Sequence, residues 1–384
     1  MKFIDICSGI GGFRSALEKH DHECVAFAEI DKYAKQSYKA IYNTEDEEEL
    51  DDITSIADEH FRIYRGQVDI ITGGFPCQTF SIAGKRRGFE DTRGTIFFHI
   101  ARAIKEIQPS YVLLENVKGL LSHDKGRTYG TIVQALDELG YFVEWGVFNS
   151  KYWGVPQNRE RVYILVTRKD LWKEPKLFNL LKKQTSVDTR LIDILETNVD
   201  ESYYLSEEKT KKLTLNEDLS GKLNQYDYLE RDRVHSVNKV SPTLNTMQGG
   251  DRQPKVAMVT NTLYLESKRR SGRMGKQAIE TIKENIEEVC DGYTINAYNK
   301  TIDKSGLSPT LTTRPEGFKT AILPITNNLR IRKLTPLECW RLQGFTDEQF
   351  YKAKNDGLSN SQLYKQAGNA VTVNVVDAIV GEIE

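Results

Sequence analysis

The stretch Phe3-Ile4-Asp5-Ile6-Cys7-Ser8-Gly9-Ile10-Gly11-Gly12-Phe13 joins an apolar run to a glycine-rich turn, and a helix-period segment over 12–19 follows it. The apolar run predicts a buried strand, and the periodic segment predicts a helix. Glycines leave the backbone bare, so a ligand can approach such a turn closely. Alone the turn is a weak indicator, because a strand-to-helix turn that binds nothing has the same composition.

From this turn to about residue 167, short apolar runs alternate with helix-period segments. Strands are predicted over 3–7, 25–30, 68–72, 111–115, 142–148 and 162–166, and helices over 12–19, 31–42, 95–107 and 128–139. Strands that are apolar on both faces belong in a parallel sheet covered by helices on each side. The sequence therefore predicts an α/β fold with a doubly wound, mostly parallel sheet, which binds nucleotides at the carboxyl ends of its strands.

This alternation of strands and helices ends after about residue 186, where the chain becomes polar. One further helix is predicted in this polar region, over 276–289. Amphipathic helix patterning returns over 334–350, and a last helix is predicted over 372–383. We therefore expect one domain over 1–186 plus 351–384, an inserted smaller domain over 187–330 and a connecting helix region over 331–350. The insert contains the segment Ser-Pro-Thr-Leu twice, at 241–244 and 308–311.

The composition of the chain limits its class. Its 384 residues are 39% hydrophobic and 28% charged, which is typical of a soluble globular protein and excludes disorder as the main state. The chain enters a strand at once and lacks a run of about 18 uncharged apolar residues, so we expect no signal peptide and a cytoplasmic location. Its five cysteines form no C-x-x-C pair, so the sequence indicates neither a disulfide framework nor a metal site.

A nucleic-acid partner requires local basic surface, because the formal net charge is −2. Such surface is predicted in the second half, where Lys268, Arg269, Arg270, Arg273 and Lys276 lie close together. A solvated loop without a partner explains these residues equally well.

Two acids stand where predicted strands end, at the edge of the sheet where ligands bind. Glu29 ends the second strand, and a carboxylate there is the usual partner of ribose hydroxyls. Glu115 ends the strand over 111–115, which is otherwise apolar. Asp52, near the end of an acidic run, is a candidate partner for an exocyclic amine.

The loop over 72–81 contains the cysteine most suited to chemistry. Cys77 lies just past a predicted strand, in a loop shaped by Gly73, Gly74 and Pro76. A structural cysteine is normally embedded in an apolar element, which is how we interpret the other four. Cys77 is therefore the candidate nucleophile.

Two arginines precede the last strand of the series in the pattern Gln157-x-Arg159-x-Arg161. Residues two apart in an extended segment lie on the same side, so these guanidinium groups form a fork suited to a carboxylate or phosphate. Two unconnected surface arginines are the alternative.

In their order along the chain, these motifs resemble those of the bacterial and phage DNA (cytosine-5) methyltransferases of restriction-modification systems, over essentially the whole length. The matching segments are Ser8 to Phe13, Glu29, Asp52-Ile53-Thr54, Gly74 to Gln78, Glu115-Asn116-Val117, Gln157 to Arg161, Arg332 to Phe345 and Gly368-Asn369-Ala370-Val371. The chain departs from the family where Cys7 replaces a common Phe and where Ile30 replaces a common aromatic residue.

The resemblance implies methyl transfer from S-adenosyl-L-methionine to a flipped-out cytosine of double-stranded DNA, through a covalent adduct with Cys77. It implies that Glu115, Arg159 and Arg161 complete the catalytic set, without a metal. The cofactor is expected to contact Ser8, Gly9, Gly11, Gly12, Phe13, Glu29, Ile30, Asp52, Ile53, Pro76, Asn369, Ala370 and Val371. The DNA is expected to contact Gln78, Ser81, Thr310, Leu311, Arg269 and Arg270.

The insert over 187–330 then becomes a target-recognition domain, in which Thr310-Leu311 matches the family's Thr-Leu and the copy at Thr243-Leu244 is unexplained. We expect a monomer, with any cognate restriction endonuclease acting separately. A tRNA cytosine-5 methyltransferase and a catalytically silent DNA-binding homologue remain alternatives. A nicotinamide oxidoreductase is a third, because a glycine turn followed by an acid also describes that class.

Overall fold

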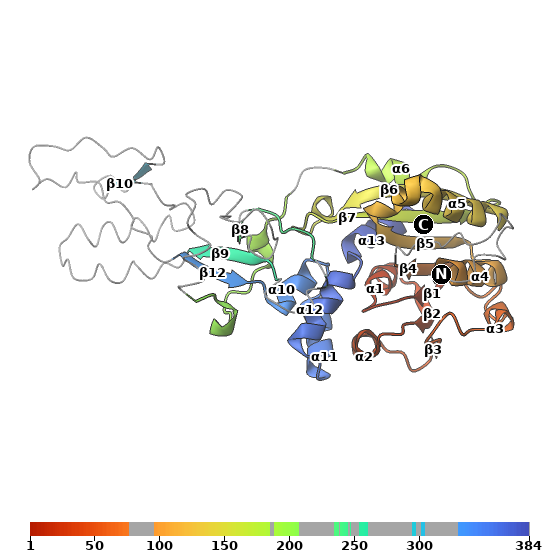
Figure 1. Ribbon diagram of the computed structural model, residues 1–384, viewed down its shortest axis with the longest axis horizontal. Helices are drawn as coiled ribbons and strands as arrows, with labels where there is room; N and C mark the ends of the chain where they lie inside the picture. The colour runs from red at the N-terminus through yellow and green to blue at the C-terminus, as the bar shows by residue number, and fades with distance from the viewer. Residues whose placement is uncertain are drawn as a thin grey trace, which may run out of the picture.

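The computed structural model describes residues 1–76, 96–184, 188–206, 234–237, 239–244, 246, 253–259, 294–296, 301–303 and 329–383. Its centre is a seven-stranded sheet in the order β3-β2-β1-β4-β5-β7-β6 (Figure 1). The strands are β1 (Lys2–Ile6), β2 (Glu23–Ala28), β3 (Glu48–Glu49), β4 (Ile70–Gly74), β5 (Tyr111–Val117), β6 (Tyr141–Asn149) and β7 (Glu160–Arg168).

Strands β1 to β5 are parallel, whereas β7 lies antiparallel between β5 and β6. The predicted doubly wound, mostly parallel sheet is thus confirmed. The reversal at β7 follows from its connection to β6, which is a short loop with one 3₁₀ turn and not the crossover helix that a parallel pair needs.

Helices cover both faces of this sheet. One face carries α1 (Gly12–Glu18), α2 (Lys32–Ile41), α6 (Lys176–Leu181) and α13 (Val373–Val380), and the other carries α3 (Asp58–Arg62), α4 (Ile96–Ile107) and α5 (Arg127–Glu138). Apart from the two-residue β3, each strand of this sheet feeds both cores because its side chains alternate: in β1, Phe3 lies in the first core, and Ile4 and Ile6 lie in the second.

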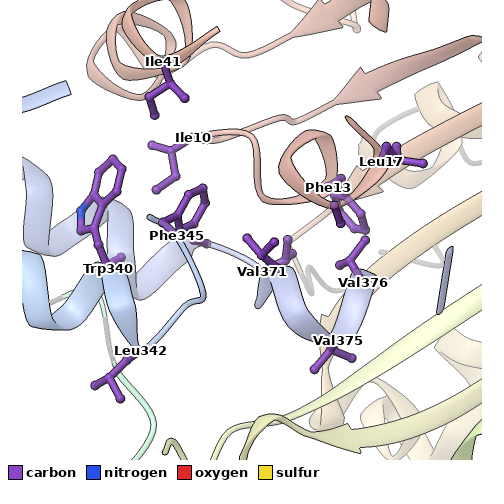
Figure 2. Close-up of a cluster of buried hydrophobic side chains, with 14 of the residues drawn as sticks. Ile10, Phe13, Leu17, Ile41, Trp340, Leu342, Phe345, Val371, Val375 and Val376 are labelled. Carbon is purple, nitrogen blue, oxygen red and sulfur yellow. The ribbon is translucent and has the colours of Figure 1, made fainter. Parts of the chain in front are cut away.

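The last helix returns to the first. Figure 2 shows Phe13 and Leu17 of α1 beside Val371, Val375 and Val376, which lie in and just before α13. The end of the chain therefore packs against its beginning. Within the described residues, no helix is long and apolar enough to cross a membrane.

The patterning over 334–350 divides into two helices, α10 (Pro336–Arg341) and α11 (Asp347–Asn355), and α12 (Asn360–Asn369) follows. Gly344 lies in the break with φ +82°, and a Cβ there would lie 2.1 Å from Oδ1 of Asn374. Thr335 and Thr346 begin α10 and α11 with capping boxes. The region with helix patterning is therefore helical but contains a break, because a second cap starts a second helix.

The remaining elements are short. A three-stranded sheet contains β8 (Val234–Ser236), β9 (Lys255–Val259) and β12 (Leu329–Lys333), and β10 (Thr294–Asn296) pairs with β11 (Thr301–Asp303). Within the part of the chain that the structure describes, the 3₁₀ helices are Lys118–Leu121, His123–Gly126, Ser150–Tyr152, Leu191–Ile194 and Glu201–Tyr203. The helix predicted over 276–289 lies outside the described residues.

Candidate functional site

A cleft of about 600 Å³ opens at the carboxyl edge of the parallel strands. This volume is in the range of pockets that hold a cofactor. Many residues singled out from the sequence line the cleft together, namely Ser8, Gly9, Gly12, Phe13, Glu29, Pro76, Glu115, Arg159, Arg161, Asn369, Ala370 and Val371. The structure thus gathers the ends of β1, β2, β4 and β5, the β6–β7 loop and the segment after α12 around one space.

Other singled-out residues have different positions. Gly11, Ile30, Asp52 and Ile53 are not among the lining residues. The Ile30 side chain is 74% exposed, whereas Ile53 belongs to the core. The carboxylate of Asp52 accepts a hydrogen bond from the backbone N–H of Thr54 at 2.9 Å. Cys77, Gln78, Ser81, Arg269, Arg270, Thr310 and Leu311 lie outside the described residues.

The glycine turn orients the acid at the end of β2. The backbone N–H of Gly9 donates to Oε2 of Glu29 at 2.8 Å, and that of Asp31 donates to Oε1 at 2.8 Å. Gly9 has φ +57°, and a Cβ on it would meet no atom within 4 Å, so its bare backbone faces open space. Each carboxylate oxygen retains acceptor capacity toward the cleft.

The other two glycines of the turn are needed for packing. A Cβ on Gly11 would lie 2.3 Å from the ring of Tyr42, and a Cβ on Gly12 would lie 2.5 Å from Cγ2 of Val371. Gly12 and Val371 both line the cleft. The glycine turn can therefore touch the C-terminal segment only because Gly12 has no side chain.

Cys7 also lines the cleft, in a left-handed conformation with φ +53°. Burial raises the pKa of its thiol to about 12, and the nearby acids Glu29, Asp5 and Asp52 add to this shift. The thiol is therefore protonated at neutral pH, which makes it a poor nucleophile.

Glu115 faces the cleft from β5, where Nε of Arg161 lies 3.1 Å from its Oε1. Burial raises the pKa of this carboxyl, while the charges of Arg159 and Arg161 oppose the rise. Its neighbour Asn116 donates from Nδ2 to the carbonyl of Phe75 at 2.7 Å. The start of the loop that leads to Cys77 is therefore tied to the strand that carries Glu115.

Arg159 and Arg161 have different partners and do not form one fork. Arg161 pairs with Glu115, whereas Arg159 is 2% exposed and donates to backbone carbonyls. Its acceptors are Leu244 at 3.3 Å, Gly368 at 3.3 Å and Ala370 at 2.7 Å. Burial lowers the pKa of Arg159 to about 10, with the charge of Arg161 adding to the shift, so the group remains a cation at neutral pH.

The first Ser-Pro-Thr-Leu copy docks beside these arginines. Oγ1 of Thr243 donates to the carbonyl of Asn158 at 2.7 Å, and the backbone N–H of Asn158 donates to the carbonyl of Ser241 at 2.8 Å. Thr243, Leu244 and Thr246 line the cleft. The duplication drew attention to this segment, although the sequence did not place it at the cleft.

The α12 side of the cleft was also missed. Gln362, Lys365 and Gln366 line it, as does Asp31 at the start of α2. The spacing of Gln362, Gln366 and Asn369 puts them on one face of a helix. Because Asn369 was expected to contact the cofactor, this spacing could have predicted that Gln362 and Gln366 also face the cleft.

Comparisons with known proteins cover the whole chain. The family model for the C-5 cytosine-specific DNA methylases matches residues 1–384. An orphan methyltransferase, M.SPRI of Bacillus phage SPR, is 36% identical over 433 aligned residues, which cover 100% of this chain and 97% of that protein. The type II methyltransferase M.HhaI of Haemophilus parahaemolyticus is 32% identical over 397 residues, which cover 100% of this chain and 94% of that protein.

A solved structure, the Dnmt2 methyltransferase of S. pombe, superimposes with a TM-score of 0.63. The match covers 99% of this chain and 96% of that one at 17% sequence identity. At this identity the likeness concerns the fold.

Proposed function

The chain belongs to the C-5 cytosine-specific DNA methylase family, and from that premise we propose that Cys77 attacks a flipped-out cytosine in a specific duplex sequence, with S-adenosylmethionine as methyl donor. The protein is a DNA (cytosine-5) methyltransferase. The observation that carries the mechanism is that Glu115, paired with Arg161, and the positioned carboxylate of Glu29 line the same cleft. In this proposal Glu115 binds the target cytosine, and Glu29 binds the cofactor.

The cofactor side fits the proposed donor. Gly9 offers bare backbone and Glu29 offers a held carboxylate for ribose hydroxyls, which is how this class of fold binds nucleosides. In the proposal Phe13, Asn369 and Val371 complete the pocket. When bound, S-adenosylmethionine supplies a methyl group on a sulfonium centre.

On the base side, C5 of cytosine is a poor nucleophile until a thiolate adds to C6 and pushes electron density onto C5. Cys77 performs this addition, and Glu115 hydrogen-bonds N3 and the exocyclic amine, where charge accumulates. Burial raises the pKa of Glu115, which favours the protonated form that N3 requires. After C5 is methylated it loses its proton to a base, and the electron pair left behind expels the Cys77 thiolate.

The target base must leave the duplex to enter the cleft, as in other DNA methyltransferases. We propose that Thr243 and Thr246 form its DNA-facing wall, because they line the cleft on the side of the insert. Gln78, Ser81, Arg269, Arg270, Thr310 and Leu311 remain proposed DNA contacts. In this proposal the protein acts as a cytoplasmic monomer, separately from any endonuclease.

The test is the variant Cys77→Ser, which should lose methyl transfer to duplex DNA and keep its affinity for S-adenosylhomocysteine. The unchanged chain should form a denaturant-resistant adduct with DNA containing 5-fluorocytosine, since fluorine cannot leave as the proton does. Methyl transfer by the variant, or absence of the adduct, would contradict the mechanism. Methylation of tRNA in preference to duplex DNA would instead favour an RNA substrate.

A further inference from the structure

Helix α12 joins the cleft to the first turn of α2 through two consecutive side chains. Nζ of Lys365 lies 2.6 Å from Oδ2 of Asp31, and Nε2 of Gln366 donates to the carbonyl of Tyr33 at 2.9 Å. We propose that Lys365 is a positioning residue: it fixes Asp31, whose backbone N–H in turn orients Glu29 toward the cofactor ribose. The proposal rests on the function proposed above, because it assigns Glu29 to the cofactor.

The path from Lys365 to Glu29 consists of measured contacts. Oδ1 of Asp31 caps α2 by accepting from the N–H groups of Tyr33 at 2.9 Å and Ala34 at 3.2 Å, which leaves Oδ2 for Lys365. The backbone N–H of Asp31 donates to Oε1 of Glu29. The position of Asp31 therefore sets one of the two hydrogen bonds that hold the Glu29 carboxylate.

The other hydrogen bond to Glu29 comes from the backbone N–H of Gly9, so two different segments of the chain hold the carboxylate. Gly9 belongs to the turn after β1, whereas Asp31 caps a helix that is hydrogen-bonded to α12 through the carbonyl of Tyr33. Oγ of Ser37, one turn further along α2, donates to Oε1 of Gln366 at 3.0 Å, so α12 grips α2 at two levels. Lys365 is the charged member of this grip and lines the cleft itself.

Electrostatics agree with this geometry. The pKa of Asp31 lies below its usual range: burial opposes the shift, but the hydrogen bonds from Lys365, Ala34 and Tyr33 outweigh it. The carboxylate is thus ionised and can keep both its cap and its ion pair. The two side chains are 29% and 32% exposed, so the ion pair is partly shielded from solvent.

The experiment is calorimetric titration of the full chain with S-adenosylhomocysteine. Lys365→Met should raise the dissociation constant about fivefold, the upper range for a partly exposed ion pair. Lys365→Arg should restore most of the affinity because it keeps the charge. Lys169→Met is the matched control, since it removes an ion pair of 2.7 Å to Asp137 that lies away from the cleft.

A double-mutant cycle with Glu29→Ala separates positioning from direct contact. If Lys365 acts through Glu29, Lys365→Met should cause no further loss in the Glu29→Ala background. An equal loss in both backgrounds, or unchanged affinity of Lys365→Met, overturns the proposal while the proposed function stands. Unchanged affinity of Glu29→Ala itself overturns both the cofactor assignment and the role of Lys365.

Discussion

The cleft has two walls that are built differently. The sheet wall consists of Gly9 and Glu29, which stand just after the ends of the adjacent strands β1 and β2, and of Glu115, which lies near the end of β5. The linked wall consists of Arg159 and the segments that its guanidinium holds, with Leu244 85 positions away in sequence and Ala370 211 positions away. Sheet topology places the residues of the first wall, whereas one buried cation assembles the second.

This difference predicts different consequences of mutation. A functional side chain on the sheet wall can change without moving its neighbours, because the backbone ladder holds the strand. Arg159 also stabilises the fold, because the buried carbonyls of Leu244, Gly368 and Ala370 accept its hydrogen bonds. We therefore expect mutations in the sheet wall to lower the rate of methyl transfer, and mutations in the linked wall to lower the stability of the folded protein.

The largest effect is expected for Glu115→Gln on the sheet wall. The amide has no acid proton for N3, and loss of such a group typically costs a factor of about 10² to 10⁴ in rate. Single-turnover methylation should show this loss, while calorimetry should show unchanged affinity for S-adenosylhomocysteine. A fall in cofactor affinity of the same size would mean that Glu115 supports the pocket and that the two walls are not separable.

Arg159→Met tests the linked wall. The change leaves buried carbonyls without donors, and about 3 kcal/mol of unfolding free energy should be lost. Urea denaturation followed by tryptophan fluorescence measures this, with Arg127→Met as control. Arg127 is 65% exposed and pairs only locally with Asp124, so that variant should stay within about 0.5 kcal/mol of the parent. Equal stability of both variants would show that the linked wall does not depend on Arg159.

The same contrast explains what the sequence could predict. The sheet wall was predictable because apolar runs mark the strands and acids stand near their carboxyl ends: Glu29 directly follows β2, whereas Glu115, expected to end its strand, lies inside β5, which continues to Val117. Strand β3 was missed because its two residues, Glu48 and Glu49, are acidic and pair with β2 at the sheet edge. Helix α3 was missed because its five residues bury only Phe61.

The linked wall could not be predicted from the same signals. Nothing near Arg159 in sequence indicates that its donors meet carbonyls in the insert and near the C-terminus, and Arg159 and Arg161 do not hydrogen-bond one shared group as the predicted fork would. The docking of Thr243 on Asn158 is equally remote, since 85 positions separate them. Local patterns describe strands and helices, whereas these contacts depend on how the insert and the C-terminus return to the sheet.

Gly12→Ala probes the contact between the glycine turn and Val371, which directly follows Ala370, one of the residues that accept a hydrogen bond from Arg159. The added Cβ would lie 2.5 Å from Cγ2 and 3.0 Å from the carbonyl oxygen of Val371, and the backbone atom cannot rotate away. Overpacking of this kind costs about 1 to 3 kcal/mol. We expect this loss in denaturation together with weaker binding of S-adenosylhomocysteine.

Gly130→Ala is the matched control, because a Cβ there meets no atom within 4 Å in helix α5. Alanine in a helix interior should be neutral or stabilising by about 0.5 to 1 kcal/mol. If Gly12→Ala behaved like this control, the close contact between the glycine turn and Val371 would not constrain the cleft.

The smallest effect is expected for Thr243→Val in the first Ser-Pro-Thr-Leu copy. Thr243→Val removes the hydrogen bond to the carbonyl of Asn158 and should cost about 1 kcal/mol, or about fivefold, in affinity for duplex DNA. Cofactor affinity should not change, and Thr243→Ser should bind as the parent does. Because Thr243 acts here by holding the wall of the cleft, the loss should be similar for every duplex.

Thr310→Val is the counterpart in the second copy and should change sequence discrimination, since a lost base contact costs about 1 to 3 kcal/mol at the cognate site alone. Binding to cognate and unrelated duplexes distinguishes the two behaviours. If Thr243→Val altered discrimination and Thr310→Val did not, recognition would lie in the copy docked on Asn158, beside the arginine that assembles the linked wall. The insert would then read sequence and complete the cleft with the same four residues, and the second copy would be the one without an assigned role.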